Sequence, residues 1–321
     1  MDCESNYDHA LTLLGSRFMA NKRHRSILHP ALIPTWIVVF LLYCLSKLPM
    51  SVKQVWGEKL GRLLHRKLKG RVKVCRQNID GCFPELNDAE KTKLVEDTFV
   101  DCSKGFMETV HVWWNDTQPY IDNLIVNGKE HVEEAQKRNK GILLLGGHFS
   151  IFDIALPFVA SQLKKPGYMF RPNNNPVVDR MIEQGRQRYT NIQSFDKRQL
   201  KDMIQFMKGG GEVWYAPDQD FGRKCEVFVP FFGVNTGCIT APSWIARESG
   251  ASVIQVSQYR HPNGQYEISF SPIFEGFGEN EEQDAVDWNA SLEAAIRRHP
   301  SQYLWLHKRF KTRKPGDGEF Y

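Results

Sequence analysis

A histidine and an aspartate separated by four residues carry the chemistry that this sequence suggests first. His148 follows the glycine pair Gly146-Gly147, and Asp153 lies five positions after the histidine. Glycines let the backbone turn sharply and be approached closely. An imidazole beside a carboxylate suits general-base catalysis, because the carboxylate accepts the Nδ1 proton and stabilises the imidazolium while Nε2 takes a proton from a hydroxyl. We therefore predict that His148 is a catalytic base and that Asp153 orients it.

The same residues also allow a purely structural interpretation. Ser150 and Asp153 have the spacing of a capping box, and the apolar segment Ile151–Val159 begins beside them. Asp153 would then stabilise a helix N-terminus, and His148 would be an ordinary histidine at the end of a strand. So short a pattern recurs by chance, so its surroundings must decide between the two interpretations.

Strands and helices alternate around this motif. The uninterrupted apolar run Gly141–Leu145 is typical of a strand that is buried on both faces. Further strands are expected at 167–171, 212–216, 252–258 and 266–271, and helices at 88–117 (one or two), 151–163, from Pro176, at 200–207, 240–248 and 283–298. This alternation predicts an α/β fold with a mainly parallel central sheet flanked by helices, which binds ligands at the carboxyl ends of its strands.

Three polar residues follow expected strands directly: His148, Arg171 and Asp218. Arg171 could bind a phosphate or carboxylate as a bidentate fork, or it could pair with a helix. Asp218 and Asp220 make a weak case for a metal site because no other ligand lies near them. We predict instead that they accept hydrogen bonds that shape their loop and hold Arg171 or Arg223.

Several enzyme classes are disfavoured by missing motifs. The glycine run 209–211 lacks the Lys-Ser/Thr of a phosphate-binding loop, and no G-x-S-x-G elbow of an α/β-hydrolase is present. The seven cysteines are scattered without a C-x-x-C pair, which favours reduced thiols over a zinc site or a disulfide framework.

The charge is distributed unevenly. The net charge is +5, yet residues 17–76 alone carry +13, with fourteen Lys and Arg against the single acidic residue Glu58. The residues after 76 sum to −5. A basic N-terminal region in a chain whose remainder is mildly acidic indicates an anionic partner, and lipid and nucleic acid are the candidates.

Two segments of this basic region favour lipid. Residues 30–46 are uncharged, and seventeen residues is the lower limit for crossing a bilayer core of roughly 30 Å, although a buried helix would look similar. Residues 52–74 predict one amphipathic helix that is basic on its polar side, of the kind that lies on anionic lipid. We predict a membrane anchor over 1–76 and a catalytic domain over 77–321.

The chain resembles the lipid A biosynthesis late acyltransferases, most closely the lauroyl and palmitoleoyl type, within the wider glycerolipid acyltransferase group that shares His-x4-Asp. The resemblance extends from about residue 25 to the end and is carried by ordered blocks. These are His29-Pro30, Asn78-Ile79, Cys82-Phe83-Pro84-Glu85, Gly141–Asp153, Phe170-Arg171-Pro172-Asn173, Asn175-Pro176, Val213–Gly222, Val227–Phe232 and Gln302–Arg313.

The resemblance implies an acyltransferase on the cytoplasmic face of a bacterial inner membrane, with anionic membrane lipid as a partner. It would move an acyl chain from the thioester of acyl carrier protein to the 3-hydroxyl of a primary acyl chain on Kdo2-lipid IVA. His148 and Asp153 would be catalytic, and neither a metal, a cofactor nor a nucleic acid is required. The substrate-binding residues would be Arg171, Asp218, Asp220, Arg223, Lys308 and Arg309.

Three rivals stay open at this point. A membrane hydrolase or thioesterase would use the same dyad to activate water, and another glycerolipid acyltransferase would differ only in its acceptor. A lipid-binding protein without activity would use the basic segments alone. The aromatic and basic residues of 302–315 would suit nucleic acid as well as anionic headgroups or an acidic carrier protein.

Overall fold

A seven-stranded sheet forms the centre of the computed structural model, which describes residues 27, 29–188 and 191–321. The strands lie in the order β1-β9-β8-β2-β5-β3-β4. Their bounds are β1 Ile125–Asn127, β2 Ile142–Gly146, β3 Pro166–Phe170, β4 Gln193–Asp196, β5 Glu212–Tyr215, β8 Ser252–Arg260 and β9 Tyr266–Phe270. A separate hairpin is formed by β6 Val227–Phe231 and β7 Val234–Cys238.

The sheet is mainly parallel, as predicted. Only β8 and β9 pair antiparallel, whereas β2 pairs in parallel with β8 on one side and with β5 on the other. Leu144 of β2 is in register with Ile254 and Trp214 on these neighbours. Every residue of β2 is buried, which confirms the strand expected from the apolar run.

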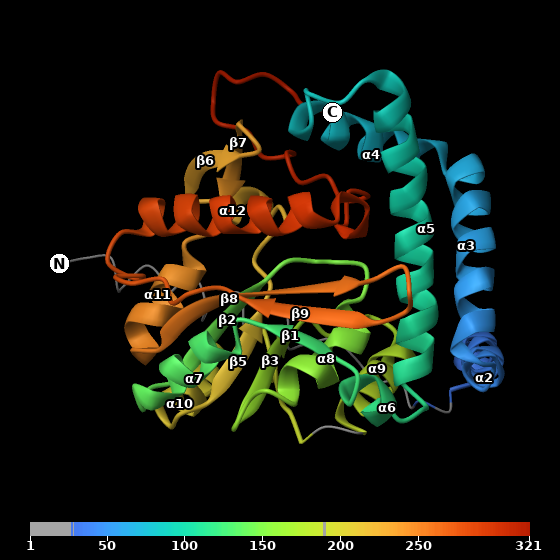
Figure 1. The fold of residues 1–321 in the computed structure, drawn as a ribbon, viewed down its shortest axis with the longest axis horizontal. Coiled ribbons are helices and arrows are strands. Elements are labelled where there is room, and N and C mark those ends of the chain that lie inside the picture. Colours follow the sequence, from blue (N-terminus) through green and yellow to red (C-terminus); the bar gives the residue numbers. More distant parts are fainter. Residues whose placement is uncertain (1–26, 28, 189–190) are drawn as a thin grey trace.

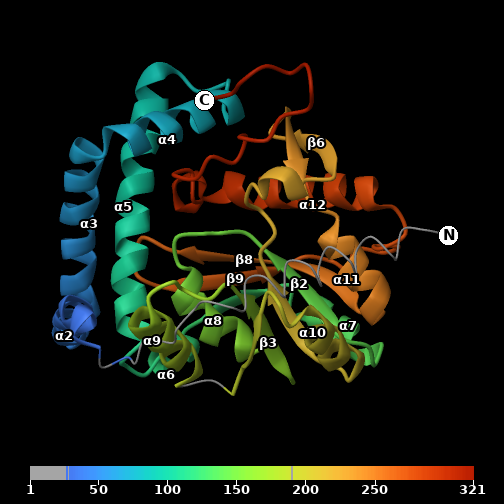
Figure 2. The same ribbon diagram turned by 180° about the vertical axis from the view of Figure 1, so that it is seen from behind.

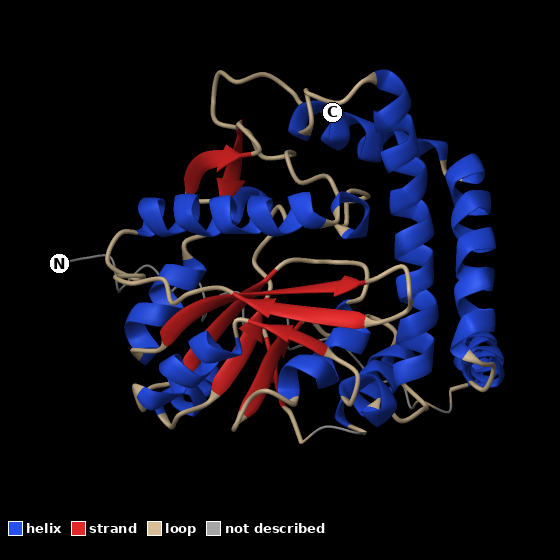
Figure 3. Ribbon diagram, in the orientation of Figure 1, coloured by secondary structure: helices blue, strands red, loops and turns tan. Residues whose placement is uncertain are grey.

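Helices cover both faces of the sheet (Figure 3). Leu143 and Leu145 of β2 face a core with Met203, Ile245 and Leu292. Ile142 and Leu144 face the opposite core, with residues of α7 and α8. The bounds are α2 Ile33–Ser46, α3 Met50–Lys67, α4 Lys69–Cys82, α5 Asp88–Val112, α6 Gln118–Ile121, α7 Lys129–Lys137, α8 Phe152–Ala160, α9 Pro176–Gln187, α10 Leu200–Lys208, α11 Ala241–Ser249 and α12 Glu281–Arg298. Short 3-10 turns are η1 Pro30–Leu32, η2 Gly222–Lys224 and η3 Pro300–Gln302.

The prediction of a single helix over 52–74 is wrong, because two helices, α3 and α4, cover this segment. Leu68 interrupts the helix with φ −92° and ψ 60°. Helix α3 then lies side by side with α5 at one end of the sheet (Figures 1 and 2). The close approach depends on Gly61, where a Cβ atom would lie 2.5 Å from the Cα of Val100. The domain boundary expected at residue 76 falls within α4, whose Cys75 and Ile79 are buried in the main core.

The apolar residues of α2 and α3 face outward. Ile37 and Phe40 of α2 are 56% and 63% exposed, and Trp56 of α3 is 52% exposed. The buried positions of α3 are instead Lys53, Gly57 and Gly61, which face α5 at a spacing of four residues. Among the residues that the structure describes, no helix is both long and apolar enough to cross a bilayer.

A buried lysine and histidine connect these helices. Nζ of Lys53 donates to the carbonyl of Ser46 at 2.9 Å and lies 2.7 Å from Nδ1 of His111 on α5. Burial, followed by the charge of Lys53, lowers the pKa of His111 from 6.5 to about 4. Burial, followed by the charge of Lys47, lowers the pKa of Lys53 from 10.5 to about 8. At neutral pH the ammonium therefore donates to a neutral imidazole.

This pair predicts loss of stability in acid. Between pH 6.5 and about 4, His111 is protonated in the unfolded chain but stays neutral in the folded protein. The free energy of unfolding therefore falls as the pH falls, by at most about 1.4 kcal/mol per pH unit from this group. Denaturant titrations in detergent at pH 7 and pH 5 should show a larger loss for wild type than for His111→Asn, which keeps an acceptor for Lys53 but does not titrate. Equal losses would contradict the assignment.

Candidate active site

The carboxyl ends of three neighbouring parallel strands bring the predicted polar residues to one edge of the sheet. His148 follows β2, Asp218 follows β5 and Arg171 follows β3, and β5 lies between the other two. The chain leaves β2 through Gly146, where a Cβ atom would lie 2.0 Å from Nε1 of Trp214. Only glycine fits this position beside β5, so the glycine keeps the two strand ends close together.

Asp218 is the carboxylate that binds His148. Its Oδ1 lies 2.5 Å from Nδ1 of the imidazole, and its Oδ2 accepts the backbone N–H of His148 at 2.8 Å. The hydroxyl of Tyr303 donates to the same Oδ2 at 3.0 Å. The Asp218 side chain is fully buried, whereas the imidazole is 32% exposed. The carboxylate of Asp218 is thus shielded from solvent, whereas the imidazole of His148 is accessible from outside.

The electrostatics of this pair favour one tautomer. Burial lowers the pKa of His148, but the charge and hydrogen bond of Asp218 outweigh it and raise the pKa above 6.5. Burial raises the pKa of Asp218, but His148 and the other donors lower it below 3.8. Because Asp218 is ionised, Nδ1 of the neutral imidazole carries the proton and Nε2 has a free lone pair. This is the arrangement of a general base.

The contact expected between Asp153 and His148 is not formed. Oδ1 of Asp153 accepts from Nε of Arg186 on α9 at 2.7 Å, and Thr109 on α5 lies 3.5 Å from Oδ2. The capping box is absent as well, because α8 begins at Phe152 with no side-chain cap and the Ser150 hydroxyl has no partner among the described residues. Asp153 therefore belongs to a second charged pair of the site and does not bind the imidazole, although it lies in the first turn of α8 as the structural interpretation expected.

The ring of Phe152 lies between the His148–Asp218 pair and the Arg186–Asp153 pair. Phe152 stacks on His148, with ring centroids 5.6 Å apart and an angle of 11° between the rings. The guanidinium of Arg186 lies 5.7 Å from the centroid of the same Phe152 and 5.4 Å from that of Tyr168. Such cation–π contacts and the ion pair with Asp153 hold Arg186 close to the imidazole.

The remaining predicted residues divide into exposed and buried ones. Arg171 is exposed and makes no hydrogen bond or ion pair with the described residues. Lys308 is also exposed, with Nζ 5.0 Å from the Tyr321 ring centroid. Asp220 makes no hydrogen bond or ion pair with Arg171: it accepts from the backbone and hydroxyl of Thr312 at 2.6 and 2.9 Å. The side chain of Arg223 lies outside the described residues.

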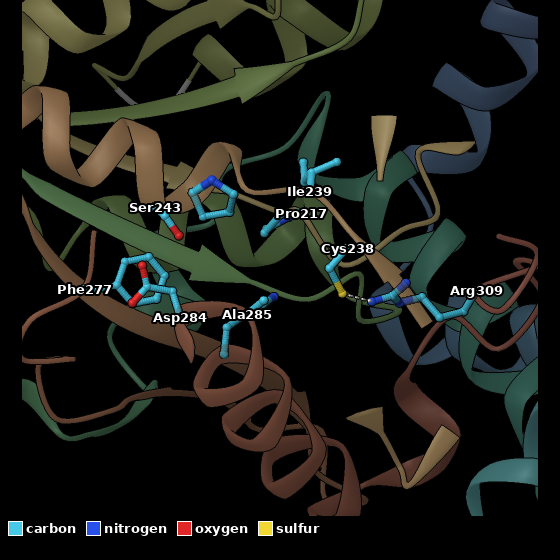
Figure 4. A pocket seen from close by; sticks show the side chains of 10 residues that line it. Pro217, Cys238, Ile239, Ser243, Phe277, Asp284, Ala285 and Arg309 are labelled. Carbon is cyan, nitrogen blue, oxygen red and sulfur yellow. Dashed lines mark hydrogen bonds between the residues drawn. The ribbon is translucent and has the colours of Figure 1, made fainter. Parts of the chain in front are cut away.

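Arg309 lies inside the protein. It is 3% exposed, donates to the Thr236 hydroxyl and the Gly237 carbonyl at 3.1 Å, and reaches the sulfur of Cys238 at 3.3 Å. Figure 4 shows this guanidinium beside Cys238 at the wall of a small pocket that Pro217 also lines. A second small pocket beside the pair is lined by His148, Asp218, Gln219, Tyr303, Leu304, His307 and Arg309. Arg309 thus supports the wall of the site from behind.

Known proteins with similar sequences identify the family of this chain. The family model for bacterial lipid A biosynthesis acyltransferases matches residues 20–312. The lipid A biosynthesis lauroyltransferase of Escherichia coli K12 is 36% identical over 295 residues, which cover 91% of this chain and 95% of the relative. This chain belongs to the lipid A biosynthesis acyltransferase family. The palmitoleoyltransferase of the same organism is 31% identical over 312 residues, covering 94% and 98% of the two chains.

The lipid A acyltransferase contains two site residues whose roles the sequence did not indicate. Arg186 lies in the last turn of α9, 33 residues from its partner Asp153, so no local pattern connects them. Tyr303 lies 85 residues from Asp218. An isolated antiparallel bridge between Phe149 and Tyr303 brings the C-terminal segment to the histidine. The aromatic and basic composition of that segment favoured a ligand-binding surface and gave no sign of this internal contact.

Proposed function

We propose that this enzyme transfers a fatty acyl chain, lauroyl or similar, from the thioester of acyl carrier protein to the 3-hydroxyl of a primary acyl chain on Kdo2-lipid IVA. The observation that carries the proposal is the buried Asp218 bound to Nδ1 of a partly exposed His148. This pair suits deprotonation of a hydroxyl, and the family supplies the lipid A-type acceptor. The thioester of an acyl carrier protein is the donor that such an alkoxide would attack.

The proposed reaction needs one base and one leaving group. Nε2 of His148 takes the proton of the acceptor hydroxyl as its oxygen bonds to the thioester carbonyl carbon. The carbon–sulfur bond then breaks, and the thiolate leaves with the proton held by the imidazolium. Asp218 stabilises the imidazolium between these steps, so the histidine is neutral again at the end. This sequence involves no covalent enzyme intermediate.

The arginines of the site would bind the anionic groups of the substrates. Arg186 adds positive charge next to the imidazole, although its pair with Asp153 offsets part of that charge. Arg171 is exposed at the same edge of the sheet and would bind a glucosamine phosphate or the phosphate of the carrier protein's prosthetic group. Lys308 would act on the same anionic groups from the exposed surface.

The enzyme is proposed to work on the cytoplasmic face of the inner membrane, and the outward apolar residues of α2 and α3 support binding to lipid. Ile37, Phe40 and Trp56 are exposed, and α3 also carries exposed basic residues such as Lys59 and Arg62. Apolar side chains that enter the interface and basic residues beside anionic headgroups bind lipid together, with about 1 kcal/mol for each basic residue. The acceptor lipid would then reach the site from the surface that holds the enzyme.

Charging this face should release the enzyme from lipid. We expect Ile37→Glu with Phe40→Glu to lower binding to vesicles containing a quarter phosphatidylglycerol by at least about 10-fold, because two carboxylates would enter the interface. Sedimentation with vesicles measures the binding. Lys129→Gln with Lys137→Gln changes the net charge equally on α7, at the opposite end of the molecule (Figure 1), and should bind nearly as wild type. Unchanged binding of the α2 variant would contradict the assignment.

Acyl transfer in detergent tests the proposed reaction. Lauroyl-acyl carrier protein is the donor, Kdo2-lipid IVA is the acceptor, and mass spectrometry should show the gain of one lauroyl group. Palmitoleoyl and myristoyl donors in competition identify the preferred chain. Release of free fatty acid without acylated lipid would instead assign a thioesterase, and glycerol phosphate as a better acceptor would assign a glycerolipid acyltransferase.

A further inference from the structure

We infer that Tyr303 is a positioning residue that tunes the basicity of His148 through Asp218. The inference rests on the proposed role of His148 as the base. Asp218 binds the imidazole through Oδ1, and Tyr303 donates to Oδ2 at 3.0 Å. Tyr303 therefore acts on the base through the carboxylate without touching it.

Three donors satisfy the buried carboxylate. Oδ1 faces Nδ1 of His148, while Oδ2 accepts from the His148 backbone and from Tyr303. Among the described residues no lysine or arginine forms an ion pair with Asp218. Within the part of the chain that the structure describes, the Tyr303 hydroxyl is thus the only side-chain donor, besides the imidazole, that shares the negative charge of this fully buried group. Removing it leaves each of the two oxygens with a single donor.

The C-terminal segment holds the tyrosine and the histidine backbone together. The amide of Leu304 donates to the carbonyl of His148 at 3.0 Å, and the amide of Ser150 donates to the carbonyl of Gln302 at 2.6 Å. The Tyr303 ring packs against Trp305 at 4.8 Å and Phe149 at 5.8 Å between centroids. The phenol therefore cannot turn away from Asp218 without breaking this packing. Burial, followed by the charge of Asp218, raises the pKa of Tyr303 well above its usual range, so the hydroxyl keeps its proton.

The Tyr303 hydroxyl is expected to lower the pKa of His148, because it takes up part of the negative charge of Asp218. A hydrogen bond to a carboxylate favours its ionised form and lowers its basicity. Without the Tyr303 hydroxyl, the charge of Asp218 acts more strongly on the imidazolium, and the pKa of His148 rises. The other charged or titratable groups around this site are Arg186 from α9, Asp220 from the loop after β5, and His307 and Arg309 from the C-terminal segment. None of them is altered when only the phenolic oxygen is removed.

The test compares Tyr303→Phe with Tyr259→Phe. Tyr259 is an equally buried tyrosine that also packs on Phe149, but its hydroxyl donates to the carbonyl of Ala295 at 2.9 Å. In enzyme labelled at histidine Cε1, we expect the pKa of His148 to rise by about half a unit to one unit in Tyr303→Phe and to stay unchanged in Tyr259→Phe. The acid limb of the pH profile of kcat/KM for acyl transfer should shift to higher pH by the same amount. At pH 6 this shift lowers kcat/KM about 3- to 10-fold, because less of the histidine is neutral.

A second variant covers the case in which Tyr303→Phe does not fold. Replacing Tyr303 by 3-fluorotyrosine keeps the hydroxyl but makes it a stronger donor, so the pKa of His148 should fall. The inference is overturned if both variants leave that pKa within 0.2 units of wild type, a tolerance of roughly 0.3 kcal/mol. The titration needs no turnover. Absence of acyl transfer by wild type would therefore overturn the proposed function, whereas an unmoved titration would overturn the role of Tyr303.

Discussion

Replacing His148 by alanine is expected to lower kcat/KM for acyl transfer by at least about 100-fold, because general-base catalysis contributes about 10² to 10⁴. The imidazole is the only group in contact with Asp218 that also reaches solvent among the described residues, at 32% exposure. Nothing else in the pair can accept the proton of the acceptor hydroxyl. Initial rates of lauroyl transfer in detergent measure the effect, at pH values above the raised pKa of the histidine.

A second histidine supplies the control for this substitution. His131 on α7 is 27% exposed and lies 3.9 Å from Glu130, away from the carboxyl edge of the sheet. His131→Ala should therefore retain the wild-type kcat/KM within about twofold, as expected for a surface change away from the site. The alanine variant at 148 should also keep its binding to anionic vesicles. Full activity of His148→Ala would remove the histidine from the mechanism and with it the proposed chemistry.

Asp218→Asn should impair transfer about 10² to 10⁴-fold, the second large effect. The amide has the same shape as the carboxylate but can donate to Nδ1, which would place the imidazole proton on Nε2 and block that atom as a base. In the Ser-His-Asp triad of serine proteases, the same change from aspartate to asparagine gives the wrong tautomer and lowers kcat by about 10⁴-fold. The effect should fall on kcat more than on KM, because Asp218 is fully buried and cannot contact substrate.

Two other carboxylates make this prediction specific. Asp220→Asn, two residues further along the same loop, removes a partner of Thr312 and leaves the imidazole pair untouched, so we expect a loss below about 10-fold. Asp153→Asn weakens the pair with Arg186. If Asp153→Asn abolished transfer while Asp218→Asn kept most of it, Asp153 would be the carboxylate that serves the histidine during catalysis.

The edge of the sheet that carries the site was predictable from the sequence, whereas the pairing of its residues was not. Apolar runs located β2, β3 and β5, and parallel strands place their carboxyl ends together. The closeness of Asp153 to His148 in the sequence then favoured the wrong partner for Nδ1. Asp153 lies in the first turn of α8 and binds Arg186 of α9, while Asp218 reaches the histidine from the loop after the neighbouring strand, 70 residues away.

Other differences have equally local causes. The amphipathic pattern over 52–74 continues through Leu68, and its periodicity carries no mark of the backbone break there. The same pattern also concealed which side of α3 packs inward, since its fully buried positions are Lys53 and two glycines, and no leucine. Arg309 looked like a surface cation because its neighbours are basic and aromatic. Its burial depends on Thr236 and Cys238 of the hairpin strand β7, which the sequence did not reveal.

The bridge between Phe149 and Tyr303 also sets an order of events during synthesis. Helices α2 and α3 leave the ribosome more than 200 residues before Gln302, Tyr303 and Leu304, which complete the surroundings of His148 and Asp218. At about 5–20 residues per second, the outward-facing helices α2 and α3 are available at least ten seconds earlier. If these helices bind lipid as proposed, the growing chain would reach the membrane before His148 and Asp218 are assembled, and the thioester donor would meet a competent enzyme only where the acceptor lipid is already within reach.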